Sequence, residues 1–368
     1  MNQEKPSDPA YERIGHPDPP GTGNRVLPGY DVTAVEKWLS ENVSLIKPPC
    51  TWTKLEGGHS NLTYLIEDAE GSKAVIRRPP TGELLPKAHD MGREWALISA
   101  LGPTKVPVPA ALGFCEDPNI IGAHFYVMGL INGHPLYTVA DTERYVPPDK
   151  RTVMAHSFID VLAQLHAVEP DAVGLGTLGK KENYIGRQLN TWYKSWNASI
   201  AGSQFDDTRA HQLHDFFRDN MPEQGPARVV HGDYGMHNCL VGPDGRIAAV
   251  VDWEISTLGD PLADLAYALN HWAEPNDAIG PRGQGPTAVP GFPSRAELAT
   301  RYAVKTGRNL AQLDYYIGFN RWKSAAIVQG VYARYLEGKK SAAGIDLNAL
   351  RESINLSLLA SAEAVGRL

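Results

Sequence analysis

The sequence has few cysteines, no long apolar run and no excess of positive charge, and each shortage excludes a class of protein. Its 3 cysteines, Cys50, Cys115 and Cys239, show no CxxC spacing, so a disulfide framework or a zinc site is not expected. No stretch approaches the roughly 20 apolar residues of a membrane-spanning helix, so no membrane partner is expected. The formal net charge of −7 argues against nucleic acid as a partner.

The beginning of the chain lacks the apolar segment of a secretion signal, which favours a cytoplasmic location. Residues 1–28 are rich in Pro, Gly and charged side chains and show no hydrophobic period, so we expect them to form a flexible leader. The chain of 368 residues, 42% of them hydrophobic, can bury a large core. Its length therefore suits two lobes or domains.

Residues 229–253, VVHGDYGMHNCLVGPDGRIAAVVDW, gather polar side chains among apolar runs. The runs 240–241 and 247–251 are typical of short strands, and the Gly-Pro-Asp-Gly between them predicts a hairpin. Asn238 precedes the first run and Asp252 follows the second, so both are expected at the open end of the hairpin. Amide and carboxylate oxygens are ligands that suit Mg²⁺, which takes its other ligands from phosphates and water.

Asp233 lies five residues before Asn238, where it could accept a proton from a substrate hydroxyl. Protein kinases space the Asp and Asn of their catalytic loop in the same way, and a further Asp after a short hairpin holds the metal ions. The pattern HGDYGMHN, followed by a hydrophobic strand and Asp-Trp, resembles the aminoglycoside phosphotransferase and choline kinase-like family.

Two other interpretations of these residues remain open. In the first, they are polar groups that cap loops in an inert fold or a degenerate kinase. In the second, they form the metal centre of a hydrolase, which would leave Asn238 without a role. The ligands of that centre would be His231, Asp233, His237 and Asp252.

The region before residue 129 is predicted to be rich in strands. Five segments show an apolar strand pattern with turn residues between them: 51–55, 62–67, 73–78, 111–115 and 124–128. A short amphipathic helix is expected to start near Asp31, with Val32, Val35 and Leu39 at helical spacing. This content suits a small nucleotide-covering lobe.

Candidate nucleotide contacts are distributed over these strands. The segment EGGHSN joins the first two strands, and around Gly58, Ser60 and Asn61 its backbone N–H groups could approach phosphate oxygens, although a plain hairpin turn fits as well. Arg77 stands where kinases carry a Lys that holds the α and β phosphates and pairs with a helix Glu. Glu94, on a helix with an apolar stripe of Trp95, Ile98 and Leu101, is the expected partner. An exposed strand-end Arg and a solvated Glu are the alternatives.

Helices are predicted to dominate beyond Pro148. Four aromatic residues between 183 and 200 either pack a helix or line a substrate pocket: Tyr184, Trp192, Tyr193 and Trp196. Further along, Asp260 can cap a helix in which Pro261 takes the first position. Asp264 is either a favourable anion near that helix N-terminus or, by the resemblance, a support for the backbone of the catalytic loop.

The last third of the chain holds a loop and two helix signals. Residues 274–293 are rich in Pro and Gly and form a candidate substrate-side flap. Ser294 and Glu297 form a capping box that starts a helix. Residues 317–336 predict a long amphipathic helix, with Trp322, Ile327 and Tyr332 among its expected core residues.

The resemblance, which includes a likeness to the kinase-like domains joined to acyl-CoA dehydrogenases, implies an α+β, protein kinase-like fold with two lobes. A β-rich N-lobe at 29–128 would precede a helical C-lobe at 129–368, with adenine bound by the backbone of a hinge that includes Met128 and Leu130. The implied reaction transfers the γ-phosphoryl group of ATP to a hydroxyl of a small molecule, with ATP and Mg²⁺ as cofactors.

The resemblance also implies a role for each site residue. Asp233 would orient or deprotonate the acceptor hydroxyl, Asn238 and Asp252 would bind Mg²⁺, and Arg77 would steady the phosphates. The acceptor is aminoglycoside-like or hydroxyacyl thioester-like, and the lack of an acidic run in the pocket segments favours the less cationic class. Because Arg77 replaces the Lys of kinases, a nucleotide-binding regulatory module with little transfer activity is the alternative.

Overall fold

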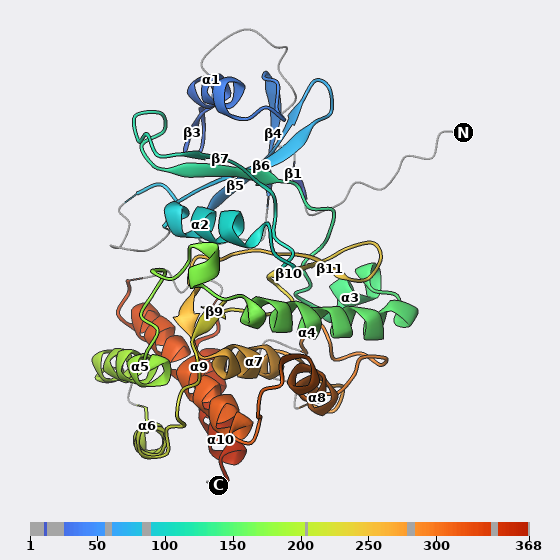
Figure 1. Ribbon diagram of the computed structural model, residues 1–368. Coiled ribbons are helices and arrows are strands. Elements are labelled where there is room, and N and C mark those ends of the chain that lie inside the picture. The colour runs from blue at the N-terminus through green and yellow to red at the C-terminus, as the bar shows by residue number, and fades with distance from the viewer. Residues whose placement is uncertain are drawn as a thin grey trace. The chain divides into compact units, whose positions relative to one another are not determined.

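The computed structural model describes residues 11–12, 26–55, 61–82, 90–202, 205–277, 284–339 and 345–366 (Figure 1). The chain divides into two compact units, one of Met1–Asn132 with Ala249–Glu254 and one of Gly133–Ala248 with Ile255–Leu368. The phosphate-binding loop predicted at Gly58 and Ser60 lies outside the described residues, as do most of the predicted leader and part of the predicted flap.

An antiparallel sheet of six strands, in the order β1-β4-β5-β6-β8-β7, forms the first unit. The strands are β1 (Tyr11–Glu12), β4 (Cys50–Leu55), β5 (Leu62–Asp68), β6 (Lys73–Arg78), β7 (Ala111–Cys115) and β8 (Phe125–Gly129). The five predicted strands agree with β4 to β8 to within one residue at each end. A difference lies at β1, which pairs Tyr11 with Leu55 inside the segment predicted as a leader. It pairs with β4, whose outer edge would otherwise leave backbone groups unpaired.

Two helices accompany this sheet. Helix α1 (Val32–Asn42) follows the small ribbon of β2 (Val26–Leu27) and β3 (Tyr30–Asp31), and the Asp31 side chain accepts a hydrogen bond from the backbone of Ala34. Its predicted apolar residues are all buried in one core cluster with side chains of the sheet. Helix α2 (Met91–Leu101) buries Glu94 together with apolar neighbours. Trp95 is only half-buried and stacks on Phe114, because Leu97 takes the buried position expected for it.

Helices make up most of the second unit. They are α3 (Val139–Tyr145), α4 (Arg151–Ala167), α5 (Tyr184–Ile200), α6 (Thr208–Asp219), α7 (Pro261–Asn270), α8 (Arg295–Thr306), α9 (Leu313–Leu336) and α10 (Leu347–Ala364), with 3-10 turns η1 (Pro148–Lys150) and η2 (Asp171–Val173). Helix α9 packs against α5, α7 and α10 and contributes much of their shared core. Trp322 and Tyr332 are buried as predicted, but Ile327 is 38% exposed. Its expected core position was wrong because the buried face follows Trp322, Ala325, Ala326 and Gln329.

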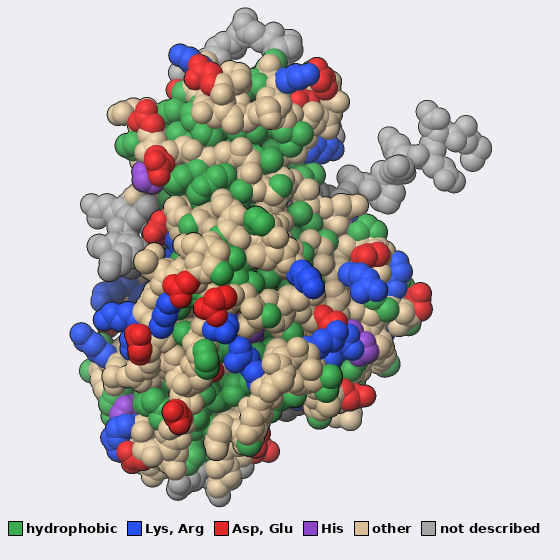
Figure 2. All heavy atoms as spheres, viewed as in Figure 1, with side chains coloured by type: hydrophobic (Ala, Val, Ile, Leu, Met, Phe, Trp, Pro, Cys, Tyr) green, Lys and Arg blue, Asp and Glu red, His purple; other side chains and the backbone are tan. Residues whose placement is uncertain are grey.

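Short strands lie in and around residues 229–253, the central segment of the chain. Strand β9 (Arg228–Val230) pairs antiparallel with β12 (Thr257–Gly259), and β10 (Cys239–Val241) pairs with β11 (Ile247–Val250), so the predicted hairpin is present. Both predicted helix starts are confirmed: Asp260 caps α7, and Ser294 forms the capping box of α8 with Glu297. None of the described helices is long and apolar enough to cross a membrane. On the face drawn in Figure 2, acidic and basic side chains are interspersed.

Candidate functional site

The loop after β9 carries the candidate catalytic residue and is held by a buried carboxylate. Gly232 adopts φ +83°, which glycine reaches at no steric cost, and so turns the chain before Asp233. Asp264, on α7, accepts hydrogen bonds from the backbone N–H of His231 at 2.7 Å and of Gly232 at 2.8 Å. The support predicted for Asp264 is therefore confirmed.

Asp264 is the middle of a buried polar chain. His166 Nε2 lies 3.3 Å from Asp264 Oδ2, and His166 Nδ1 lies 2.7 Å from the hydroxyl of Tyr302. This geometry suits a neutral imidazole that donates to Asp264 and accepts from Tyr302. Burial lowers the pKa of His166, and Asp264 offsets part of that effect. His166 therefore fixes the orientation of Asp264, and through it that of the loop.

Hydrogen-bond donors reach both oxygens of the Asp233 carboxylate. The Tyr267 hydroxyl donates to Oδ1, while His237 Nε2 lies 3.2 Å and Asn238 Nδ2 3.1 Å from Oδ2. Burial would raise the pKa of Asp233, but the bonds from His237 and Tyr267 outweigh it and hold the pKa well below its usual range. The carboxylate is thus ionised and oriented, which suits it to accept a hydrogen bond from a hydroxyl.

Asn238 is oriented by the same loop. Its Nδ2 donates both to the backbone carbonyl of Asp233 at 3.0 Å and to the carboxylate. Because both contacts use the amide nitrogen, the amide oxygen stays available for a cation. No hydrogen bond from another described residue reaches that oxygen.

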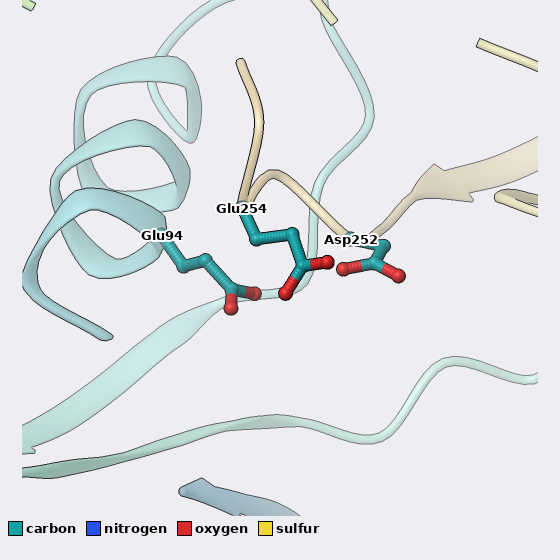
Figure 3. Close-up of side chains that lie close together, drawn as sticks. All are labelled: Glu94, Asp252 and Glu254. Atoms are coloured by element: carbon teal, nitrogen blue, oxygen red, sulfur yellow. The ribbon is translucent and has the colours of Figure 1, made fainter. Parts of the chain in front are cut away.

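Three carboxylates converge in the first unit (Figure 3). Glu94 comes from α2, and Asp252 and Glu254 come from the segment after β11; one oxygen of each lies within 4.8 Å of the others. Asp252 adopts φ +65°, an uncommon conformation for a residue other than glycine and one that often marks functional sites. Asn61 Nδ2 lies 3.4 Å from both Glu94 Oε1 and Glu254 Oε2, and so links two of the three carboxylates.

Arg77 on β6 pairs with two of these carboxylates. Its guanidinium lies 3.4 Å from Glu94 and 2.7 Å from Asp252, so the predicted Arg77–Glu94 pair is present. Burial raises the pKa of Glu94 to about 7 although Arg77 lowers it, and the charge of Asp252 adds to the increase. Because Glu94 is 1% exposed, a solvated helix residue was the wrong alternative.

The charge balance of this cluster suits a cation. Within the group, the carboxylates of Glu94, Asp252 and Glu254 outnumber the guanidinium of Arg77. Carboxylate oxygens are the ligands that Mg²⁺ prefers, so the residues fit a divalent ion. The sequence reasoning missed Glu254, although the Asp-x-Glu spacing beside a candidate ligand was a usable signal.

The remaining predicted residues lie on the sheet and beyond it. Met128, in β8, pairs with Val75 and is 9% exposed, and Leu130 directly follows the strand. Their backbone contacts with adenine stay a prediction. The sequence reasoning also missed Tyr267, which lies three residues after Asp264 on α7; that spacing places two residues on one helix face.

Solved structures share this fold. A Ralstonia eutropha protein named as a candidate aminoglycoside phosphotransferase is 29% identical and has a TM-score of 0.78, covering 92% of this chain and 99% of its own. Choline kinase from Cryptosporidium parvum, at 11% identity, has a TM-score of 0.63 and covers 92% of this chain and 96% of its own. The fold is thus the protein kinase-like fold of small-molecule kinases, as the sequence predicted.

The chain belongs to the phosphotransferase enzyme family, whose sequence model matches residues 51–313. Among curated relatives, the probable acyl-CoA dehydrogenase IBR3 of Arabidopsis thaliana is 32% identical over 88% of this chain. Acyl-CoA dehydrogenase family member 10 of Mus musculus is 34% identical over 84%. The matched region makes up only 42% of the first relative and 29% of the second, so the chain spans less than half of either protein.

Proposed function

We propose that the protein is an ATP- and Mg²⁺-dependent phosphotransferase that moves the γ-phosphoryl group of ATP to a hydroxyl of a small molecule. The observation that carries this proposal is the ionised Asp233 carboxylate, held by Tyr267, His237 and Asn238 in a member of a phosphotransferase family. A structure of the phosphotransferase APH(4)-Ia, which is 16% identical and shares this fold at a TM-score of 0.54, contains AMP-PNP with hygromycin B. That complex supports a nucleotide as the phosphoryl donor.

In the proposed reaction the acceptor hydroxyl donates its hydrogen bond to Asp233. The bond from the γ-phosphorus to the β–γ bridging oxygen breaks, a bond to the acceptor oxygen forms, and the hydroxyl proton passes toward Asp233. Because the pKa of Asp233 is lowered, its carboxylate is a weak base. Its main contribution is therefore to orient the acceptor hydroxyl, and the hydroxyl proton is transferred late in the reaction.

Asn238 and Asp252 are the residues that we propose to hold Mg²⁺, with Glu254 and Glu94 beside Asp252. When bound, Mg²⁺ supplies charge neutralisation at the phosphate oxygens. Arg77 would exchange part of its contact with Asp252 for a phosphate oxygen, which its fixed positive charge permits.

The acceptor is proposed to be hydroxyacyl thioester-like rather than aminoglycoside-like. The names of the Arabidopsis and mouse relatives support this choice, because one is named a probable acyl-CoA dehydrogenase and the other a member of the acyl-CoA dehydrogenase family, and each contains a region similar to this chain. If the joined regions of those relatives act on the same class of compound, a hydroxylated acyl thioester would be a substrate for both.

ADP release with Mg-ATP, measured over a panel of aminoglycosides, choline-like alcohols, sugars and hydroxyacyl thioesters, tests the proposal. Asp233→Asn is the control, because it keeps the shape of the side chain and removes its charge. We expect release that depends on one acceptor class and falls about 10²–10⁴-fold in the variant, with Mg-ATP binding within about threefold. Intact Mg-ATP binding without release for any acceptor would favour the regulatory module, and loss of both would contradict the phosphotransferase assignment.

A further inference from the structure

Lys323, in the middle of α9, is a buried lysine that has no counter-ion among the described residues. Its residue is 9% exposed, and no hydrogen bond or ion pair joins its ammonium group to any part of the chain that the structure describes. Its closest recorded contact is a ring, since Nζ lies 6.0 Å from the ring centroid of Trp192 on α5. Lysine is almost never fully buried unless it is paired, because removing its charge from water is costly. Its place in the unit therefore needs an explanation.

The neighbours of Lys323 connect it to the candidate catalytic loop. Asn320, one turn earlier on the same face of α9, donates to the backbone carbonyl of Ala263 on α7 at 2.8 Å. The next residue of α7 is Asp264, which holds the loop, and Tyr267 lies one turn further on. Burial lowers the pKa of Lys323, whereas the charges of Asp264 and Asp233 raise it. The face of α9 that carries Asn320 and Lys323 therefore packs against the part of α7 whose Asp264 holds the loop of Asp233.

Neither carboxylate pairs with the Lys323 amine. The oxygens of Asp264 accept from the backbone of His231 and Gly232 and contact His166. Those of Asp233 accept from Tyr267 and Asn238 and contact His237, which leaves room for one further donor, and no ion pair joins them to Lys323. The three N–H donors of Lys323 consequently remain for a ligand.

We propose that Lys323 is the acceptor-binding cation of this site: it binds a carboxylate or phosphate group of the acceptor while Asp233 receives the acceptor hydroxyl. This inference rests on the proposed function and narrows its substrate class to acceptors with a hydroxyl and an anionic group. The ring of Trp192 provides an apolar surface beside the same amine. A polycationic acceptor is disfavoured, because it would bring like charge to a buried ammonium group.

The test uses short hydroxyalkyl acceptors that share one hydroxyl and differ only at the far end, which is a carboxylate, a phosphate monoester, a carboxamide or an ammonium group. Calorimetry in the presence of Mg-ADP gives the Kd of each, and ADP release gives kcat/KM. We expect the wild-type chain to bind at least one of the two anionic acceptors about 10–100-fold more tightly than the carboxamide, and the ammonium acceptor most weakly. The Kd values of the carboxylate and phosphate acceptors show which of the two anionic groups the site binds more tightly.

Lys323→Met removes the charge and keeps the length of the side chain. We expect it to abolish the preference for the anionic acceptors and to change carboxamide binding by less than about threefold. Lys323→Arg, which keeps a positive charge, should retain part of the preference and provides a second variant should the first fold poorly. The matched control is Lys194→Met, an exposed lysine on α5 two residues after Trp192, which should behave as the wild type.

Equal binding of all four acceptors, or binding of none, overturns the proposal. A preference that survives in Lys323→Met also overturns it, even if turnover falls, because Lys323 would then act by positioning Asp233. The Kd measurements do not need turnover, so they decide the role of Lys323 separately from the proposed function, whose failure would appear as absent Mg-ATP binding and absent ADP release in the wild type.

Discussion

Asp233 and Asp252 are both acidic residues of the central segment, yet their surroundings have opposite character. Hydrogen-bond donors surround the Asp233 carboxylate in the helical unit, where Tyr267, His237 and Asn238 reach it. The Asp252 carboxylate in the β-rich unit has Glu94 and Glu254 as neighbours, with Arg77 as a partner. The first environment fixes an anion in one orientation, and the second gathers more negative than positive charge.

The difference shows how one residue type serves two tasks. A carboxylate whose oxygens are held by donors can accept a hydrogen bond from a defined direction, which suits the positioning of a hydroxyl. A carboxylate among other carboxylates gains most from a cation that several of them can share. Substitutions around each carboxylate test whether the two have these separate tasks.

Asp252→Ala should have the largest effect, on nucleotide binding. It removes a proposed ligand of Mg²⁺ and leaves Arg77 paired with Glu94, so we expect the affinity for Mg-ATP to fall about 100-fold or more, since loss of even an indirect metal contact costs about 10–100-fold. Titration calorimetry of Mg-ATP measures this, with Asp233→Asn as the comparison. Similar Kd values in the two variants would erase the distinction between the carboxylates.

Asp264→Asn should weaken the helical unit itself. The buried carboxylate accepts two backbone N–H groups, and an amide would direct an NH₂ group toward a donor. We expect the free energy of unfolding to fall by about 2–4 kcal/mol, measured by urea denaturation. Asp314→Asn, at an exposed position in the first turn of α9, is the matched control and should cost less than about 1 kcal/mol. Equal losses would mean that Asp264 does not hold the loop.

Tyr267→Phe removes one donor to Asp233 and keeps the ring, which stacks on His271 with centroids 4.2 Å apart. We expect kcat to fall about 10-fold, the value of one hydrogen bond to a charged group, with the KM for Mg-ATP unchanged. Steady-state kinetics measures both constants. In Tyr193→Phe, whose hydroxyl contacts His211 on α6, kcat should not change. A rise in KM without a change in kcat would assign Tyr267 to nucleotide binding instead.

His166→Gln should have the smallest effect, because glutamine can replace part of the hydrogen bonding to Asp264 and Tyr302, and its clearest sign is a changed pH dependence of stability. Burial lowers the pKa of His166 below its unfolded value near 6.5, so the folded state binds fewer protons than the unfolded state between the two values. The contribution of His166 is therefore fully present above about pH 6.5 and is lost as the pH falls toward the folded pKa, by up to about 1.4 kcal/mol per pH unit.

Urea denaturation of the wild type and His166→Gln at pH 7.5 and pH 5.5 measures this contribution. The free energy of unfolding should fall more in the wild type than in the variant over this interval, because glutamine does not titrate. An equal fall in the free energy of unfolding in both proteins would show that other groups cause the sensitivity to acid. The buried polar chain through Asp264 would then not depend on a neutral imidazole at His166.

Local patterns made much of the fold predictable. Short apolar runs between turn residues gave β6 and β7 their bounds, and the side chains of Asp31 and Ser294 marked helix starts because capping depends on residues three positions apart. The same reasoning failed at Ile327, where a 3.6-residue period admits two neighbouring faces and only the packing of α9 chooses between them.

Local patterns in the sequence were enough to locate strands β4 to β8 and the candidate catalytic pair, because the spacing between Asp233 and Asn238 and the hairpin that follows are local properties of the chain. The groups that surround Asp233 and Asp252 come from distant parts of the chain and depend on tertiary packing. Arg77 reaches Asp252 across 175 residues, and Tyr267 reaches Asp233 across 34. Lys323 acquires its buried position from the packing of α9 against α5 and α7. Burial and long-range pairing set the charge and orientation of a side chain, and no local pattern encodes them.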